Sequence, residues 1–250
     1  MKSPAILLLS IMLSAGAACG QSDSSGADSA TCDTVVSTTP SIADFPVDSI
    51  PPAALEDRYT RLTDEDFRIV AEELGVEVAA IKAVVSIEAG HSMHGFYAPG
   101  VPVVNFDPTV YRKFAGKVSA TKPDKNEKVP AGLSGYALKE WTQLVNARKK
   151  NPDGANMGTF WGMFQIGGFN YKLCGCESIN QFVELMSDSE FAQLELFAKF
   201  IYNTGMVTSL KNKNWAAFAH KYNGAGYAKR GYHTKMANAY KKFKAQESKK

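Results

Sequence analysis

The chain has 250 residues, of which 45% are hydrophobic and 21% are charged, and its formal net charge is +3. This length and composition allow one substantial hydrophobic core and a small appendage. After the first 18 residues, no segment has the apolar length of a membrane-spanning helix, which excludes a protein with several membrane spans.

The N-terminus predicts export. After Met1-Lys2, an apolar run over residues 5–13 leads through small residues to Cys19. The run is too short to span a bilayer, so residues 1–18 are predicted to be an export signal. Two cleavage sites stay open: an Ala-x-Ala cut after Ala17, and a lipoprotein-type cut before Cys19, whose thiol would be acylated. The polar residues that follow Cys19 favour lipidation and predict a membrane-anchored lipoprotein that faces the periplasm or the cell wall.

Residues 19–58 are predicted to form a disordered acidic tether. They are rich in Ser, Thr, Asp, Ala and Pro, show little periodicity, and contain seven acidic residues against one basic residue, Arg58. Without this segment and Lys2, the chain has 26 basic and 18 acidic residues, so residues 59–250, which include the predicted domain at 59–247, carry about +8. An exported basic domain favours a polyanionic partner such as peptidoglycan, and the export signal argues against nucleic acid.

Hydrophobic periodicity predicts a mainly α domain. Thr63-x-x-Asp66 has the pattern of a capping box and begins a helix that runs to Leu74, where Gly75 ends it. A second, strongly apolar helix covers 78–88. Two short β-prone runs between 95 and 106 surround a Pro99-Gly100 turn and predict one small hairpin. Further helices are predicted near 108–114, 136–148, 157–166, 178–186, 188–204, 213–222 and 232–246.

Glu88 is the residue of greatest chemical interest, because it ends the apolar helix and is followed by Ala89-Gly90. A carboxyl group at the edge of a low-dielectric interior has its charged form disfavoured. Its pKa therefore rises, and it can donate a proton near neutral pH. The alternative is a solvated glutamate in an ordinary helix C-cap region.

Two downstream segments favour the chemical interpretation. They read Gly158-Thr-Phe-Trp-Gly-Met-Phe-Gln-Ile-Gly167 and Ala219-His-Lys-Tyr-Asn-Gly-Ala-Gly-Tyr227. Together with Glu88 they resemble, in order, the motifs of lysozyme-like muramidases and lytic transglycosylases. The chain most closely resembles the N-acetylmuramidase family of phage endolysins and bacterial cell-wall hydrolases, over about residues 76–243. The resemblance implies a lysozyme-like α+β fold with a small β-hairpin beside the helix that carries Glu88.

The resemblance also implies roles for single residues. Glu88 would be the general acid, Gln165 would contact sugar from the floor of a cleft, and Tyr222 and Asn223 would contact sugar nearby. Aromatic rings stack on the apolar faces of pyranoses, although each ring is also a candidate for the core; the aromatic candidates are Phe96, Trp161 and Tyr227.

Asp107 is the candidate second carboxylate. Phe106-Asp-Pro-Thr109 stands where the family has a Phe-Glu-x-His segment, so the acid is one methylene shorter and the histidine is missing. Asp107 would be a nucleophile or base if its carboxyl faced that of Glu88 across a cleft. The alternative is an N-cap for a helix that begins at Pro108.

The predicted activity is hydrolysis of the β-1,4 bond between N-acetylmuramic acid and N-acetylglucosamine. The alternatives are a lytic transglycosylase, which gives 1,6-anhydromuramyl products, and a non-catalytic peptidoglycan-binding lipoprotein. We expect a monomer that needs no cofactor. We also expect no metal, because His91 and His94 lack the spacing of a helical zinc site. With Cys19 lipidated, three cysteines are left, namely Cys32, Cys174 and Cys176; we rank unpaired or partly paired thiols first, a disulfide second and metal binding last.

Overall fold

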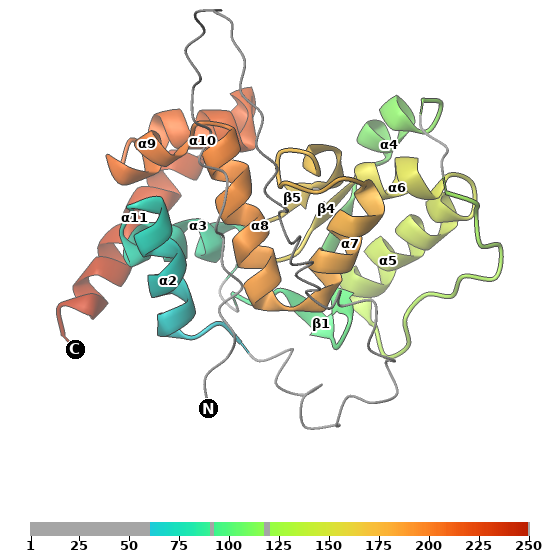
Figure 1. Ribbon diagram of the computed structural model, residues 1–250, viewed down its shortest axis with the longest axis horizontal. Coiled ribbons are helices and arrows are strands. Elements are labelled where there is room, and N and C mark those ends of the chain that lie inside the picture. The colour runs from blue at the N-terminus through green and yellow to red at the C-terminus, as the bar shows by residue number, and fades with distance from the viewer. Residues whose placement is uncertain (1–60, 91–92, 118–120, 250) are drawn as a thin grey trace, which may run out of the picture. The chain divides into compact units, whose positions relative to one another are not determined.

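The computed structural model describes residues 61–90, 93–117 and 121–249, which belong to one compact unit (Figure 1). The predicted export signal and tether, with Cys19, Cys32 and His91, lie outside the described residues. None of the described helices is both long and apolar enough to cross a membrane.

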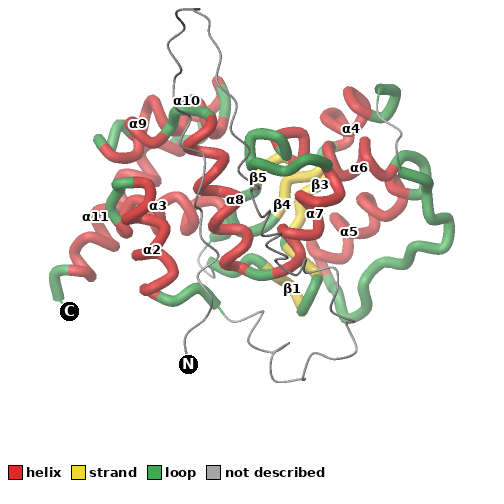
Figure 2. The backbone as a smooth tube through the Cα atoms, viewed as in Figure 1, coloured by secondary structure: helices red, strands yellow, loops and turns green. Residues whose placement is uncertain are grey.

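The described chain is mainly helical, and its short strands form a small patch among the helices (Figure 2), as the sequence predicts. The helices are α2 (Asp64–Leu74), α3 (Val78–Glu88), α4 (Pro108–Phe114), α5 (Gly135–Arg148), α6 (Pro152–Met157), α7 (Ile179–Asp188), α8 (Glu190–Asn203), α9 (Val207–Lys211), α10 (Trp215–Asn223) and α11 (Tyr232–Glu247). The strands are β1 (Phe96–Ala98), β2 (Val101–Pro102), β3 (Val104–Phe106), β4 (Thr159–Trp161) and β5 (Ile166–Gly167). Short 3-10 turns cover η3 (Gly168–Asn170) and η4 (Ala225–Tyr227).

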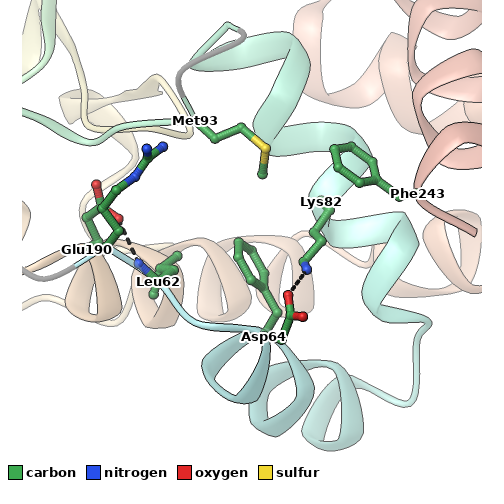
Figure 3. Close-up of a pocket in the computed structure, with 8 residues that line it drawn as sticks. Leu62, Asp64, Lys82, Met93, Glu190 and Phe243 are labelled. Carbon is green, nitrogen blue, oxygen red and sulfur yellow. Dashed lines mark hydrogen bonds and ion pairs between the residues drawn. The ribbon is translucent and has the colours of Figure 1, made fainter. Parts of the chain in front are cut away.

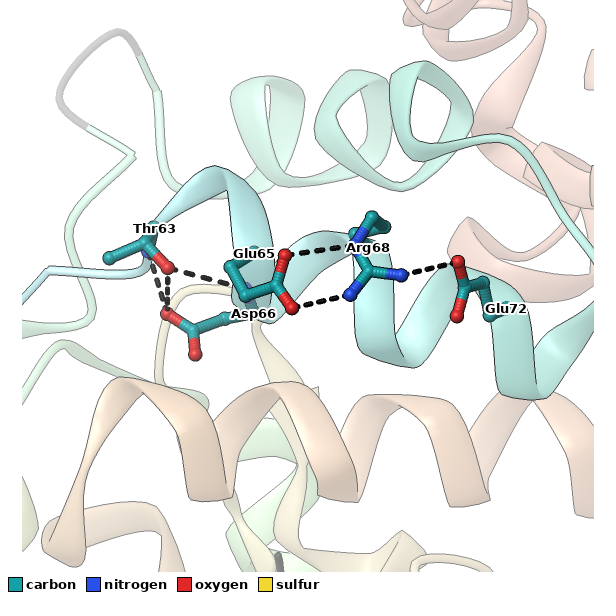
Figure 4. A network of polar contacts seen from close by, with 5 residues as sticks. All are labelled: Thr63, Glu65, Asp66, Arg68 and Glu72. Carbon is teal, nitrogen blue, oxygen red and sulfur yellow. Dashed lines mark hydrogen bonds and ion pairs between the residues drawn. The ribbon is translucent and has the colours of Figure 1, made fainter. Parts of the chain in front are cut away.

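The capping box predicted for α2 is confirmed. The Thr63 hydroxyl accepts from the Asp66 backbone N–H at 3.2 Å, and the Asp66 carboxylate accepts from the Thr63 N–H at 2.7 Å (Figure 4). Gly75 ends the helix with a left-handed φ of 62°. On the exposed face, Arg68 bridges Glu65 and Glu72. These contacts fix the first helix, which packs on α3 and α8.

Helix α3 is buried over most of its surface and packs mainly against α11, with α2 beside it. Its N-terminus is fixed by Glu77, whose carboxylate binds Lys213 at 2.6 Å, Lys244 at 2.7 Å and the Tyr240 hydroxyl at 3.0 Å. Hydrogen bonds from Lys213 and Lys244 lower the pKa of Glu77 to about 2. Both the apolar contact and this polar cluster therefore position the helix that ends at Glu88.

The strands differ from the predicted single hairpin. Strands β1 and β2 pair with each other, but β3 pairs antiparallel with β4, and β4 then pairs with β5. Val104 lies opposite Trp161, and Phe106 lies opposite Thr159. The second β-prone run is thus divided between two sheets, because a partner strand more than fifty residues later in the chain takes up its second half.

The helix predicted at 157–166 is wrong. Helix α6 ends at Met157, and the segment continues as β4, a tight turn and β5. Gly162 and Gln165 have positive φ values of 69° and 48°, which no α-helix accommodates. Phe160, Phe164 and their neighbours are apolar because they are buried in a sheet and turn. A short apolar run of this kind has the same pattern whether it is a buried strand or a buried helix.

Helix α8 crosses the interior and holds two loops by polar side chains. Glu190 is 1% exposed and accepts from the Leu62 N–H at 3.0 Å and the Gly95 N–H at 2.9 Å, and it contacts the His94 ring at 2.5 Å. It also lines a cavity of about 290 Å³ near the ion pair between Lys82 and Asp64 (Figure 3). Glu88 does not line this cavity.

Gly162 gives a test of how tightly the β4–β5 turn is packed. A Cβ there would lie 2.5 Å from the Gln193 side-chain oxygen, and Gln193 is fully buried and held by hydrogen bonds. Alanine at a positive φ is destabilising at any position. Because of the added clash, we expect Gly162→Ala to lower the free energy of unfolding by about 1–3 kcal/mol beyond that backbone effect. Gly132→Ala is the matched control, because Gly132 also has a positive φ, 79°, but open space around it. Chemical denaturation measures both, and equal losses would contradict the packing argument.

Candidate active site

Glu88 lies at the last position of α3, where the apolar helix reaches the surface. Its side chain is partly exposed, yet the atoms around it remove most of the water that would solvate a charge. This desolvation raises the pKa of Glu88 to about 7, although a hydrogen bond from Asn223 lowers it in part. At neutral pH this carboxyl group can therefore hold a proton and release it.

The last turn of α10 connects Glu88 to the Gly162–Ile166 turn. The Asn223 side-chain amide donates from Nδ2 to Oε1 of Glu88 at 2.9 Å. The preceding residue, Tyr222, donates from its hydroxyl to the Phe164 carbonyl at 2.6 Å. The end of α10 thus connects three segments that are far apart in the sequence.

The Tyr222 ring packs within an aromatic cluster, so little of it is available to stack on a sugar. Its ring stacks on Phe218 with 5.4 Å between centroids and meets Phe197 and Phe200 edge-on at 6.1 and 5.8 Å. Burial is the main cause that raises the pKa of Tyr222 well above its usual value, and the nearby Glu88 carboxyl is the second cause. Its hydroxyl is consequently neutral in the range where Glu88 titrates.

Gln165 is the one partly exposed residue in the stretch 161–168. Its positive φ turns the chain between β4 and β5, and its Nε2 donates back to the Gly162 carbonyl at 2.9 Å. Residues on both sides are buried, so this turn presents a single polar side chain toward the outside.

Two of the predicted aromatic sugar contacts lie in the core. Trp161 is 0% exposed, donates to the Asn156 carbonyl at 3.0 Å and meets Trp141 edge-on. Phe96 is 6% exposed. In this structure neither ring offers a face to a sugar, because other side chains already cover it. Tyr227 is partly exposed and packs edge-on against His220 and His233.

Asp107 is the N-cap of α4. One carboxylate oxygen, Oδ1, accepts from the Thr109 N–H at 2.7 Å and the Val110 N–H at 3.0 Å. Its backbone N–H donates to the Gly158 carbonyl, at the end of the β3–β4 ladder opposite the turn that carries Gln165. Asp107 comes three positions after Val104, which corresponds to about 10 Å along the strand. The structure therefore gives Asp107 the capping role, and its catalytic role stays a prediction.

Gln193 is a positioning residue that the sequence analysis missed. Its side-chain oxygen accepts from the Met163 N–H at 2.8 Å, and its amide nitrogen donates to Met186 at 2.8 Å and Gly95 at 3.3 Å. It thereby holds the Gln165 turn against the segment that follows Glu88. The available signal was the spacing of Glu190 and Gln193, two polar residues one turn apart on the buried face of an apolar helix.

The described residues contain no cluster of His, Cys, Asp or Glu arranged to hold a metal ion. Cys174 and Cys176 are buried and unpaired, which confirms the first-ranked prediction for these two thiols. Burial raises the pKa of both, to about 11 for Cys176, so both thiols are protonated at neutral pH and are poor nucleophiles.

Comparison with known proteins agrees with this geometry. The mainly helical fold with small antiparallel sheets is that of a lysozyme-like endolysin. Residues 77–244 match the N-acetylmuramidase family model, and the chain belongs to this family. The crystal structure of the Burkholderia AP3 phage endolysin is similar, with a TM-score of 0.61 and 34% identity over 76% of this chain and 72% of that one. No curated protein matches the chain. The family membership and the similarity to an endolysin show that the protein is a glycoside hydrolase that acts on peptidoglycan. This result argues against the non-catalytic alternative.

The two interpretations of Asp107 can be separated by substitution. Because asparagine caps a helix nearly as well as aspartate, we expect Asp107→Asn to keep both its melting temperature and near-normal lysis of purified peptidoglycan. Asp107→Ala removes the cap and should lower stability by about 0.5–2 kcal/mol. If Asp107→Asn instead lost about a hundredfold in activity with unchanged melting, Asp107 would be a catalytic base or nucleophile.

Proposed function

We propose that the protein cleaves the β-1,4 bond between N-acetylmuramic acid and N-acetylglucosamine, with Glu88 as the general acid. The observation that carries this proposal is the desolvated Glu88 carboxyl, with a pKa of about 7, in contact with Asn223. The family and the endolysin neighbour support peptidoglycan as the substrate.

The chemistry follows from the two protonation states of Glu88. Protonated Glu88 gives its proton to the glycosidic oxygen as the bond to the anomeric carbon breaks and positive charge develops on the ring. The resulting carboxylate then takes a proton from the water that attacks the ring, which restores the acid. We place Gln165 beside the scissile bond as an amide that contacts sugar, because it is the partly exposed polar residue of the turn that Tyr222 holds.

Lytic transglycosylation is the alternative outcome of the same site. In that reaction the 6-hydroxyl of the muramyl ring replaces water, and one group serves as acid and then as base. The capping contacts of Asp107 favour this alternative, since they leave Glu88 as the carboxyl in contact with the α10 motif. A reducing muramyl end marks hydrolysis, and a 1,6-anhydro end marks transglycosylation.

Glu88→Gln tests the assignment of the acid. Glutamine keeps the size of the side chain and can accept the Asn223 hydrogen bond, but its amide is not acidic enough to transfer a proton to the substrate. We expect a folded protein with no measurable release of soluble fragments from purified peptidoglycan. Mass spectrometry of the wild-type products identifies the bond and the type of end. Activity like that of the wild type in Glu88→Gln would show that another residue is the acid.

We further propose that residues 1–18 direct export and that Cys19 carries a lipid which anchors a monomeric enzyme at the membrane. Support comes from the short apolar run before Cys19 and from the substrate, which lies outside the cytoplasm.

The basic charge is concentrated in the C-terminal part of the domain. Residues 207–250 contain eleven Lys and Arg residues and one acidic residue, Glu247. Lys213 and Lys244 bind Glu77. The other exposed cations of residues 207–249 form no ion pair with a described residue; they are Lys211, Lys221, Lys229, Arg230, Lys235, Lys241, Lys242 and Lys249. Peptidoglycan carries stem-peptide carboxylates along its strands, so this surface favours contact with the polymer.

This distribution predicts where charge matters for binding. We expect replacement of Lys221, Lys229, Lys235, Lys241 and Lys242 by Gln to weaken binding of the protein to insoluble peptidoglycan several-fold at low salt and much less at high salt. The matched control removes the same charge elsewhere, at Lys113, Lys117, Lys122, Lys128 and Lys172. Co-sedimentation at several salt concentrations measures both. Equal losses in the two variants would mean that only net charge matters.

A further inference from the structure

Asn223 is the hydrogen-bond partner that the structure records for the Glu88 carboxyl, through Nδ2 and Oε1 at 2.9 Å. We propose that Asn223 is a positioning residue that keeps the transferable proton of Glu88 on Oε2 and stabilises the carboxylate left after proton transfer. This inference rests on the proposed role of Glu88 as the acid.

The argument begins with the two oxygens of a neutral carboxyl group. One oxygen bears the proton and the other is a carbonyl oxygen that accepts hydrogen bonds. An amide N–H that points at Oε1 favours Oε1 as the carbonyl oxygen, because the carbonyl oxygen of a neutral carboxyl is a better acceptor than its hydroxyl oxygen. The proton therefore resides on Oε2, which Asn223 does not contact, and it can be aimed at a glycosidic oxygen. After transfer, the same N–H donates to the carboxylate without any rearrangement.

The position of Asn223 is set by its neighbours. Tyr222 is fixed by its stack on Phe218 and by its hydrogen bond to Phe164, and Gly224 turns the chain away with φ 76° and ψ −177°. The amide therefore leaves the end of α10 at a defined place. A backbone turn that favours glycine directly after Asn223 keeps the helix from continuing past the acid.

The other end of the amide makes the contact with Glu88 decisive. The Asn223 side-chain oxygen, Oδ1, is buried and has no hydrogen-bond partner among the described residues. Glu88 alone therefore orients the amide. If the amide rotated by half a turn, Oδ1 would accept the acid's proton and hold it away from substrate. An aspartate at this position should have a similar effect, since its carboxylate would share the proton of Glu88.

Within the described part of the chain, desolvation and the Asn223 hydrogen bond are the two causes that shift the pKa of Glu88. Tyr222 is the titratable residue that the structure records in electrostatic contact with Glu88, and it stays neutral because burial raises its pKa well above 10. A change in the Glu88 pKa on substitution of Asn223 is therefore a direct measure of their hydrogen bond.

The sign of the effect is defined. A donor on the carboxylate favours the charged form, so its removal raises the pKa of Glu88 above the present value of about 7. An enzyme that needs protonated Glu88 loses activity as pH rises through this pKa. The basic limb of its pH–activity profile should consequently move to higher pH when Asn223 no longer donates.

The experiment uses the full chain with ¹³C-labelled glutamate. The carboxyl resonance that is missing in Glu88→Gln identifies Glu88, and its titration is followed by NMR in Asn223→Leu and Asn223→Asp. We expect the pKa to rise by about one unit in Asn223→Leu and by more in Asn223→Asp, where a like charge adds to the loss. The basic limb of kcat/KM should move by the same amount, and kcat should fall at all pH values. Asn238→Leu makes the same change at an exposed position of α11 and should alter neither quantity.

The outcomes separate the two claims. A folded Asn223→Leu protein whose Glu88 titration is unmoved would overturn the role of Asn223, whatever its activity. A loss of activity without a shift of the basic limb would do the same, because a purely structural role lowers the rate without changing the proton affinity. Full activity in Glu88→Gln would instead reject the proposed acid, while the NMR titration would still report on the hydrogen bond.

Discussion

The hydrogen bond between Asn223 and Glu88 is the contact on which the arrangement of the site depends. A carboxyl group at the end of an apolar helix loses solvation, and only a well-placed donor compensates for that loss. The donor comes from α10, whose adjacent Tyr222 binds the Gln165 turn. One helix end therefore fixes both the acid and the turn beside it, and a shift of α10 would displace both together.

The rest of the domain holds these two helices in register. Helix α3 packs on α11, and Glu77 at its start binds Lys213 and Lys244, one on each side of α10 in the sequence. At the other end of the site, Gln193 joins Met163 to Gly95 through one buried amide. Such amides are costly to bury unless every partner is present, so they favour a single arrangement of the loops. The site is thus held by a few buried hydrogen bonds and ion pairs among helices that pack through apolar side chains.

Local sequence signals predict the elements that depend on local interactions. The capping box of α2, the stop at Gly75 and the N-cap at Asp107 are contacts within one turn of chain, and the structure contains all three. The segment 157–166 was assigned wrongly because its strands form only by pairing with β3, more than fifty residues away. The prediction that Trp161 contacts sugar fails for a related reason, since the Trp161 ring packs against Trp141 of α5, which is distant in the sequence. The three motifs that carry the family resemblance are, in contrast, connected in the structure through Asn223 and Tyr222.

A site that relies on one carboxyl group places particular demands on that group. If no second carboxylate shares the work, Glu88 must both give a proton to the leaving oxygen and accept one afterwards, which is most effective when its pKa lies near the working pH. Desolvation alone would raise the pKa further and favour the acid at the expense of the base. The hydrogen bond from Asn223 opposes desolvation, so the value of about 7 is a balance between the two effects. The same residue that orients the proton therefore also sets how readily it returns.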